Sequence, residues 1–181
     1  VRSFLSARIP AALGYGFSHA ALPNFKHKTA RNARRLALHD RYAARGAYFV
    51  SLSGWEMPNW FAPDGQMPEV EYRYGRQPWF HFAAAEHKAT REAVALFDKS
   101  FMGKFIVQGR DAEQVLNRVS ANSVSVPVGR NIYTQWLNER GGIEADLTVT
   151  RIAEDHYMVV TAAATARRDL LWLKNHIPED A

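Results

Sequence analysis

A single carboxylate stands at the entrance of a predicted strand, directly after a pair of glycines. Gly141 and Gly142 are followed by Ile-Glu-Ala and then by Asp146, where a β-branched run begins. Paired glycines favour a tight turn, and the strand that follows would hold the short aspartate on rigid backbone, where it can face a ligand. A carboxylate held in this way can stabilise a nearby positive charge or accept a proton. The spacing alone leaves a plain turn cap as the alternative for Asp146.

Several other kinds of chemistry are excluded or weakened by what the 181 residues lack. The absence of cysteine excludes disulfides, thiolate catalysis and zinc–thiolate sites. The seven histidines form no His-x-His or His-x-x-x-His pair, so no classical metal site is predicted. Because P-loop, Gly-x-Ser-x-Gly and Gly-x-Gly-x-x-Gly motifs are all missing, any flavin or nicotinamide site would belong to another domain. The sequence contains no apolar run of about 18 residues, so no transmembrane helix is predicted.

The elements that must position Asp146 are predicted from hydrophobic periodicity. Alternating residues between turn signals predict strands over 101–108, 131–137, 146–152 and 156–161. A short helix is expected after Asp111, and an amphipathic helix over 165–176. This order predicts an α+β fold in which helices pack against one antiparallel sheet.

The signals before residue 100 are weaker. A helix is predicted over 31–45 and a strand over 47–52. The stretch 54–77 contains Pro and Gly throughout and is predicted as a loop, although its tryptophans and tyrosines indicate that it is packed down. A second helix is predicted over 84–97, where apolar residues recur at a spacing of three to four.

The basic character of the chain, whose net charge is +5, belongs to its N-terminal segment. Seven basic residues and no acidic residue precede Asp40, whereas acidic residues slightly outnumber basic ones from there on. The folded body is therefore not predicted to bind nucleic acid. A strap lying on a partner domain, a targeting peptide and a nucleic-acid contact all remain open for the segment itself.

Three sequence blocks, taken together, resemble one known family. They run from Ser53 to Phe61, from Glu86 to Phe105 and from Ile132 to Val149. In this order and spacing they resemble the folate-binding domain of the glycine-cleavage T-protein (aminomethyltransferase) family. The Gly-Trp-Glu-x-Pro-Asn-Trp-Phe motif of the first block is most similar to the form fused behind the flavin domain of dimethylglycine and sarcosine dehydrogenases. The resemblance covers residues 37–181.

The resemblance implies a tetrahydrofolate site, at which a one-carbon unit carried by an amine-derived iminium gives 5,10-methylenetetrahydrofolate. The key acid of the family maps onto Asp146, the implied catalytic residue, and pocket-lining positions map onto Tyr133, Met102, Thr148 and Val159. An aromatic face and a thioether both suit a flat pterin, so we expect Asp146 to point into a hollow beside the Tyr133 ring. FAD would belong to a fused or partner oxidoreductase domain outside this chain.

The sequence also departs from the family pattern. The usual Asp-x-Ser-His-Met-Gly motif reads Asp-Lys-Ser-Phe-Met-Gly here, so Phe101 replaces a polar neighbour of the pocket. Ala145 and Thr161 stand where the family has an acid and an asparagine. The family domain is longer than this chain, so the resemblance implies its N-terminal part over 37–181, after a basic arm or linker over 1–36. Another chain or domain would have to supply the second wall of the pocket.

Two other functions remain open. The chain could be a non-catalytic interaction module that keeps the fold for subunit contact through 54–77 and the basic arm, or it could bind nucleic acid through that arm. We expect neither nucleic acid nor a membrane among its partners. The expected compartment is the cytoplasm for a bacterial protein and the mitochondrial matrix for a eukaryotic one.

Overall fold

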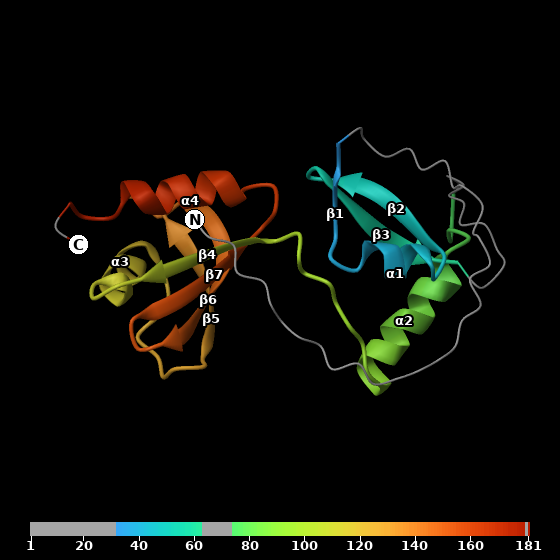
Figure 1. The fold of residues 1–181 in the computed structure, drawn as a ribbon, viewed down its shortest axis with the longest axis horizontal. Helices are drawn as coiled ribbons and strands as arrows, with labels where there is room; N and C mark the ends of the chain where they lie inside the picture. The colour runs from blue at the N-terminus through green and yellow to red at the C-terminus, as the bar shows by residue number, and fades with distance from the viewer. Residues whose placement is uncertain (1–31, 63–73, 180) are drawn as a thin grey trace.

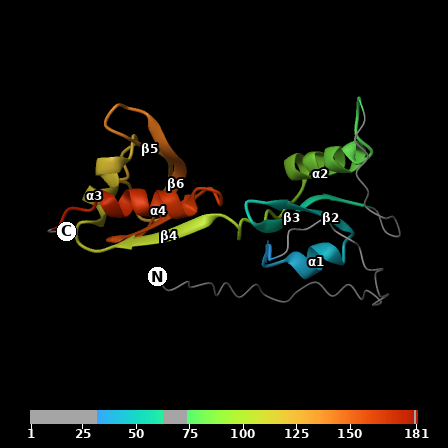
Figure 2. The same cartoon turned by 90° about the horizontal axis from the view of Figure 1, so that it is seen from above.

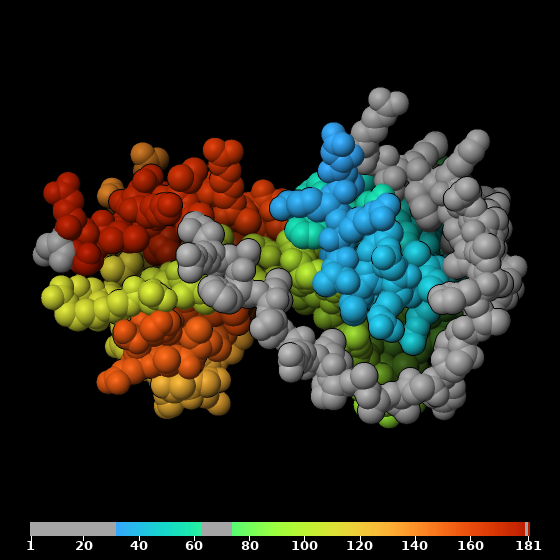
Figure 3. Space-filling model, in the orientation of Figure 1, coloured from blue at the N-terminus to red at the C-terminus, as the bar shows by residue number. Residues whose placement is uncertain are grey.

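The elements form two groups that lie side by side (Figures 1 and 3). The structure is a computed structural model that describes residues 32–62, 74–179 and 181. One group comprises elements β1 to α2 and the other β4 to α4, and residues 93–102 run between them (Figure 2). Helices packed beside sheets confirm the predicted α+β class.

The second group contains the antiparallel sheet that the alternation predicted. Its strand order is β4-β7-β6-β5. The strands are β4 (Gly103–Gln108), β5 (Asn131–Leu137), β6 (Ile143–Ala153) and β7 (His156–Thr161). Helices α3 (Ala112–Val119) and α4 (Ala166–Asn175) accompany the sheet, as predicted.

Among the described residues, helices cover one face of this sheet. Leu147 and Val159 on that face join the buried residues of α3 and α4 in a single core, which includes the fully buried Leu116 and Trp136. Fully burying a large apolar side chain contributes about 1.5–3 kcal/mol. Alternate residues point the other way, where the side chain of Ile106 is exposed. We refer to this side as the open face.

A compact turn joins β5 to β6 and sets their register. The Asn138 side-chain carbonyl accepts hydrogen bonds from the backbone N–H groups of Arg140 (3.0 Å) and Gly142 (2.9 Å). Gly141 adopts φ +77°, a conformation that favours glycine. A Cβ on Gly142 would lie 2.9 Å from the Asn138 amide. The backbone conformation of this turn therefore favours glycine at position 141, and a side chain at position 142 would displace the Asn138 amide.

The first group differs from the prediction in its strands. Its sheet has the order β1-β3-β2, with β1 parallel to β3. The strands are β1 (Arg34–Arg35), β2 (Ala47–Leu52) and β3 (Trp55–Phe61). The loop predicted over 54–77 is thus wrong for residues 55–61, while 63–73 lie outside the described residues. Pro58 is tolerated because, in the part of the chain that the structure describes, β1 pairs only with Trp55 and Glu56 and leaves the rest of that edge of β3 free.

The helices of the first group are shorter or shifted relative to the prediction. Helix α1 spans only His39–Ala43, and α2 spans Phe80–Glu92 rather than 84–97. Phe82 stacks on the buried Trp60 with ring centroids 5.8 Å apart, which explains the early start of α2. The backbone leaves the helix at Ala93, and the expected apolar stripe buries nothing, since residues 84–97 are all exposed.

The segment after α2 is held to the start of the first group by Asp98. Its carboxylate accepts hydrogen bonds from the backbone N–H groups of Leu38 (3.3 Å) and Ser100 (2.9 Å). The Ser100 hydroxyl accepts another from the backbone N–H of Ala37 (3.2 Å). The Asp-Lys-Ser part of the family-like motif therefore serves a structural contact between distant parts of the chain.

Candidate functional site

The candidate site lies on the open face, where β5 and β6 leave the Asn138 turn. Gln135 pairs with Asp146, and Tyr133 pairs with Thr148, in the antiparallel register of the two strands. The intervening residues of both strands are buried in the core. Because side chains alternate along a strand, these four side chains share the open face.

The Asp146 carboxylate lies beside two neutral side chains of β5, Gln135 and Tyr133. The Gln135 side-chain N–H donates to Asp146 Oδ1 at 3.0 Å. Hydrogen bonding from the Tyr133 hydroxyl, and then from Gln135, lowers the pKa of Asp146. The same contact with Asp146 raises the pKa of Tyr133. At neutral pH the pair therefore consists of an ionised carboxylate and a protonated phenol, which can stabilise a positive charge placed beside them.

The described residues do not enclose this pair. Asp146 is exposed, and the exposed fraction of Tyr133 is 60%. The hollow expected beside the Tyr133 ring is therefore not formed by the described part of this chain. What the strands provide is one flat wall, and a closed site would need a second wall from elsewhere.

The same wall extends across the sheet. The register places Tyr133, Thr148, Val160 and Lys104 in one row, on β5, β6, β7 and β4 in turn. Three spacings between strands make this row about 14 Å wide. Sequence reasoning identified Thr148 and Tyr133 but missed Val160 and Lys104, although the alternation of their strands placed them on this face.

The other two residues predicted to line the pocket are Met102 and Val159, and the structure places them differently from Tyr133 and Thr148. Met102 directly precedes β4 and is partly exposed, and its backbone carbonyl accepts a hydrogen bond from the Lys104 ammonium at 3.1 Å. Burial lowers the pKa of Lys104, and the charge of Asp98 opposes that shift. Val159 is fully buried on the opposite face, in the core. The structure therefore does not bring Val159 together with Asp146, and its neighbour Val160 occupies the open face instead.

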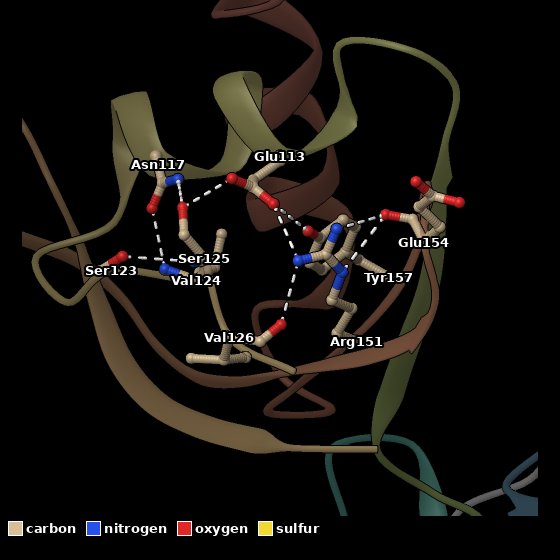
Figure 4. Close-up of polar contacts among 9 residues, drawn as sticks. All are labelled: Glu113, Asn117, Ser123, Val124, Ser125, Val126, Arg151, Glu154 and Tyr157. Carbon is tan, nitrogen blue, oxygen red and sulfur yellow. Dashed lines mark hydrogen bonds and ion pairs between the residues drawn. The ribbon is translucent and has the colours of Figure 1, made fainter. Parts of the chain in front are cut away.

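A second polar cluster lies on the other side of the sheet, between α3 and the β6–β7 hairpin (Figure 4). The Glu113 carboxylate accepts hydrogen bonds from the hydroxyls of Ser125 (2.7 Å) and Tyr157 (2.9 Å), and it pairs with Arg151 at 3.0 Å. Burial, followed by the contact with Glu113, raises the pKa of Tyr157 to about 12. The Arg151 guanidinium also donates hydrogen bonds to the backbone carbonyls of Val126 and Glu154, and it lies 5.4 Å from the centroid of the Tyr157 ring. Sequence reasoning missed this cluster.

The residues around this cluster border an open hollow of about 790 Å³. Its lining is polar and of mixed charge: Gly109, Arg110, Asp111, Glu113, Gln114, Asn117, Arg151, Glu154 and Asp155. None of the predicted site residues is among them. Since the polar side chains of the cluster satisfy one another, the cluster fastens α3 to the hairpin and offers no reactive group.

The described ranges contain neither a metal-binding cluster nor a membrane-spanning helix. Within them, no three or more His, Cys, Asp or Glu side chains gather as a metal site would require. Among the helices described, none combines the length and apolarity needed to cross a bilayer.

Comparison with known proteins identifies the family. Residues 38–181 match the model of the GCVT N-terminal domain, and the chain belongs to this family. In the crystal structure of the glycine cleavage system aminomethyltransferase T from Bartonella henselae, the match has a TM-score of 0.64 and 30% identity, covering 80% of this chain and 35% of that one. The resemblance found in the three sequence blocks is thereby confirmed.

Three relatives show the range of proteins that contain such a segment. A 4-methylaminobutanoate oxidase (formaldehyde-forming) from Paenarthrobacter nicotinovorans is 41% identical over 96% of this chain and 21% of its own length. Human mitochondrial sarcosine dehydrogenase is 36% identical over 74% of this chain and 17% of its own. A mouse mitochondrial pyruvate dehydrogenase phosphatase regulatory subunit is 28% identical over 99% of this chain and 21% of its own. The chain thus spans about a fifth of the length of these relatives.

Proposed function

We propose that this chain is the tetrahydrofolate-binding part of a one-carbon transfer enzyme of the dimethylglycine or sarcosine dehydrogenase type. The observation that carries the proposal is the ionised Asp146 carboxylate, held by Tyr133 and Gln135 on an open sheet face in a member of the GCVT family. The product would be 5,10-methylenetetrahydrofolate. Asp146 would be the catalytic residue, and Tyr133, Thr148 and Met102 would contact the pterin.

The residues of the open face fit such a ligand. The exposed ring of Tyr133 offers a flat apolar surface, and Thr148 and Val160 continue that surface across β6 and β7. A reduced folate supplies amine nitrogens that take up the one-carbon unit. Beside them, Asp146 would stabilise positive charge on an iminium or amine, orient an N–H group and accept its proton.

The exposure of the site supports an assembly with more polypeptide than this chain. The aminomethyltransferase match covers only 35% of that protein, so additional protein is available in such relatives to form the second wall. We infer that this wall comes from a further part of the parent protein or from a partner chain. An FAD-dependent domain, fused or separate, would oxidise the N-methyl amine and deliver the iminium to Asp146.

Two-dimensional NMR of the chain with millimolar folinic acid tests this function, because it detects weak binding to a half-formed site. We expect shifts at Tyr133, Thr148 and Val160, on the open face only. Asp146→Ala should reduce these shifts at least about fivefold, since a hydrogen bond to a charged group is worth about 1.5–3 kcal/mol. The matched control is Glu139→Ala, which removes an exposed acid from the adjacent turn. The absence of shifts in the wild-type chain, or shifts confined to the helical face, would contradict the proposal.

A second candidate is a non-catalytic interaction module. The similarity to a phosphatase regulatory subunit over 99% of this chain favours it. The same titration separates the two functions, because an interaction module predicts no response to folinic acid in either the wild-type chain or Asp146→Ala.

A further inference from the structure

We propose that Gln135 is the positioning residue of the site and holds the Asp146 carboxylate in place from the facing strand. The inference rests on the proposed function and adds to it a residue that acts through Asp146. Gln135 Nε2 lies 3.0 Å from Asp146 Oδ1, and the two residues are direct partners in the β5–β6 register. The glutamine side chain has the length to span such a pair, whose Cβ atoms are about 5 Å apart.

Asp146 needs such a contact because of where it lies. It is exposed on the open face, and the Gln135 side chain donates a hydrogen bond to its carboxylate there. Tyr133 lies diagonally from it, two residues further along β5, while Gln135 lies directly opposite. The hydrogen bond from directly opposite restricts the carboxylate, which favours a single orientation for a reacting group.

Gln135 is suited to this role because its side chain is uncharged as well as long enough to contact Asp146. An amide donates a hydrogen bond without cancelling the negative charge of its acceptor, whereas a lysine or arginine would neutralise Asp146. The proposed chemistry places positive charge beside this carboxylate, so a cation at position 135 would compete with the substrate. A neutral donor is therefore the residue type that orients Asp146 and preserves its charge.

The turn that precedes β6 makes this pairing reliable. Asn138 binds the backbone N–H groups of Arg140 and Gly142, and its own N–H donates to the Gly142 carbonyl at 2.9 Å. This closed turn fixes how β5 and β6 align. A slip of one residue would move Asp146 to the buried face, so the turn, Gln135 and Asp146 act together.

The test is a titration of Asp146 by carboxyl-carbon NMR in the full chain, without any ligand. We expect Gln135→Leu to raise the midpoint of Asp146 and to weaken folinic acid binding about two- to tenfold. Asn131→Leu is the matched control: it also replaces an amide on the open face of β5, but it faces Thr150 instead of Asp146. Backbone spectra of both variants check that the sheet remains folded.

Gln135→Lys separates positioning from general support of the fold. It restores a donor, so the Asp146 midpoint should return to the wild-type value or below, yet binding should stay weak because the charge is neutralised. An unchanged midpoint in Gln135→Leu or an equal change in Asn131→Leu would overturn the positioning role. Full binding by Gln135→Lys would overturn the requirement for a neutral donor. If the midpoints respond as expected but the wild-type chain does not bind folinic acid, the proposed function fails while the Gln135–Asp146 coupling is upheld.

Discussion

At the scale of single residues, two carboxylates of this chain are used in different ways. Asp146 is exposed, and the neutral Gln135 side chain that donates to it leaves its charge available. Glu113 is bound by Ser125, Tyr157 and Arg151, so its negative charge is balanced by contacts within the fold. The first arrangement suits a ligand, whereas the second stabilises the junction of α3 with the β6–β7 hairpin.

The contacts of Glu113 make the stability of the fold depend on pH. Hydrogen bonds from Ser125 and then Tyr157 lower the pKa of Glu113 below its usual 4.5 in the folded chain. The folded state therefore binds fewer protons than the unfolded state. The stabilisation is fully present above pH 4.5 and is lost as pH falls through the lower folded value. We expect urea unfolding to show a smaller loss of stability on acidification for Glu113→Gln than for the wild type.

Glu139→Gln is the control for this measurement, because Glu139 is an exposed acid of the β5–β6 turn. It should follow the wild-type acid dependence. At pH 7, Glu113→Gln should be less stable by about 1–3 kcal/mol, since Arg151 and the Tyr157 hydroxyl lose a charged partner. Identical acid dependence in all three proteins would contradict the role assigned to Glu113.

At the scale of elements, the sequence was most informative where burial alternates strictly. Strands β4 to β7 were anticipated because their inward residues form one core and their outward residues do not. The same alternation should have placed Val160, not Val159, on the open face.

Strand β3 was missed since Pro58 indicates a loop, and only the short length of β1 makes a proline acceptable there. Helix α2 was misplaced because its apolar residues suggested a buried face that the described fold does not cover.

One contact between elements depends on a residue without a side chain. Gly103 begins β4, and a Cβ there would lie 2.5 Å from the Cβ of Ala166 at the start of α4 and 3.1 Å from Thr161. Gly103→Ala should therefore destabilise the fold by about 1–3 kcal/mol through overpacking. Adding Ala166→Gly should recover part of that loss by opening space. Chemical denaturation of the two single variants and the double variant measures this coupling, and strictly additive effects would argue against the close approach.

At the scale of the whole molecule, the apolar surface is unevenly covered. The core beside α3 and α4 is closed, with Leu116 fully buried. By contrast, Val94, Leu96 and Phe97 are 96%, 74% and 61% exposed in the segment that runs between the two groups of elements. On the open face, Tyr133 is also exposed. Both surfaces agree with a chain that spans about a third of the matched aminomethyltransferase, and they mark where further protein would pack.

The exposed segment can be tested by comparing two leucine substitutions. Replacing an exposed leucine should cost little stability, whereas replacing a buried one should cost much more. Leu96→Lys should change the free energy of unfolding by less than about 0.5 kcal/mol, as expected for a surface position. Leu116→Ala should cost about 2–5 kcal/mol, because it leaves a cavity in the core. Light scattering should also show less self-association for Leu96→Lys than for the wild type, since a charge interrupts the apolar surface. If Leu96→Lys lost as much stability as Leu116→Ala, Leu96 would have to be buried within this chain. No covering partner would then be needed for this segment.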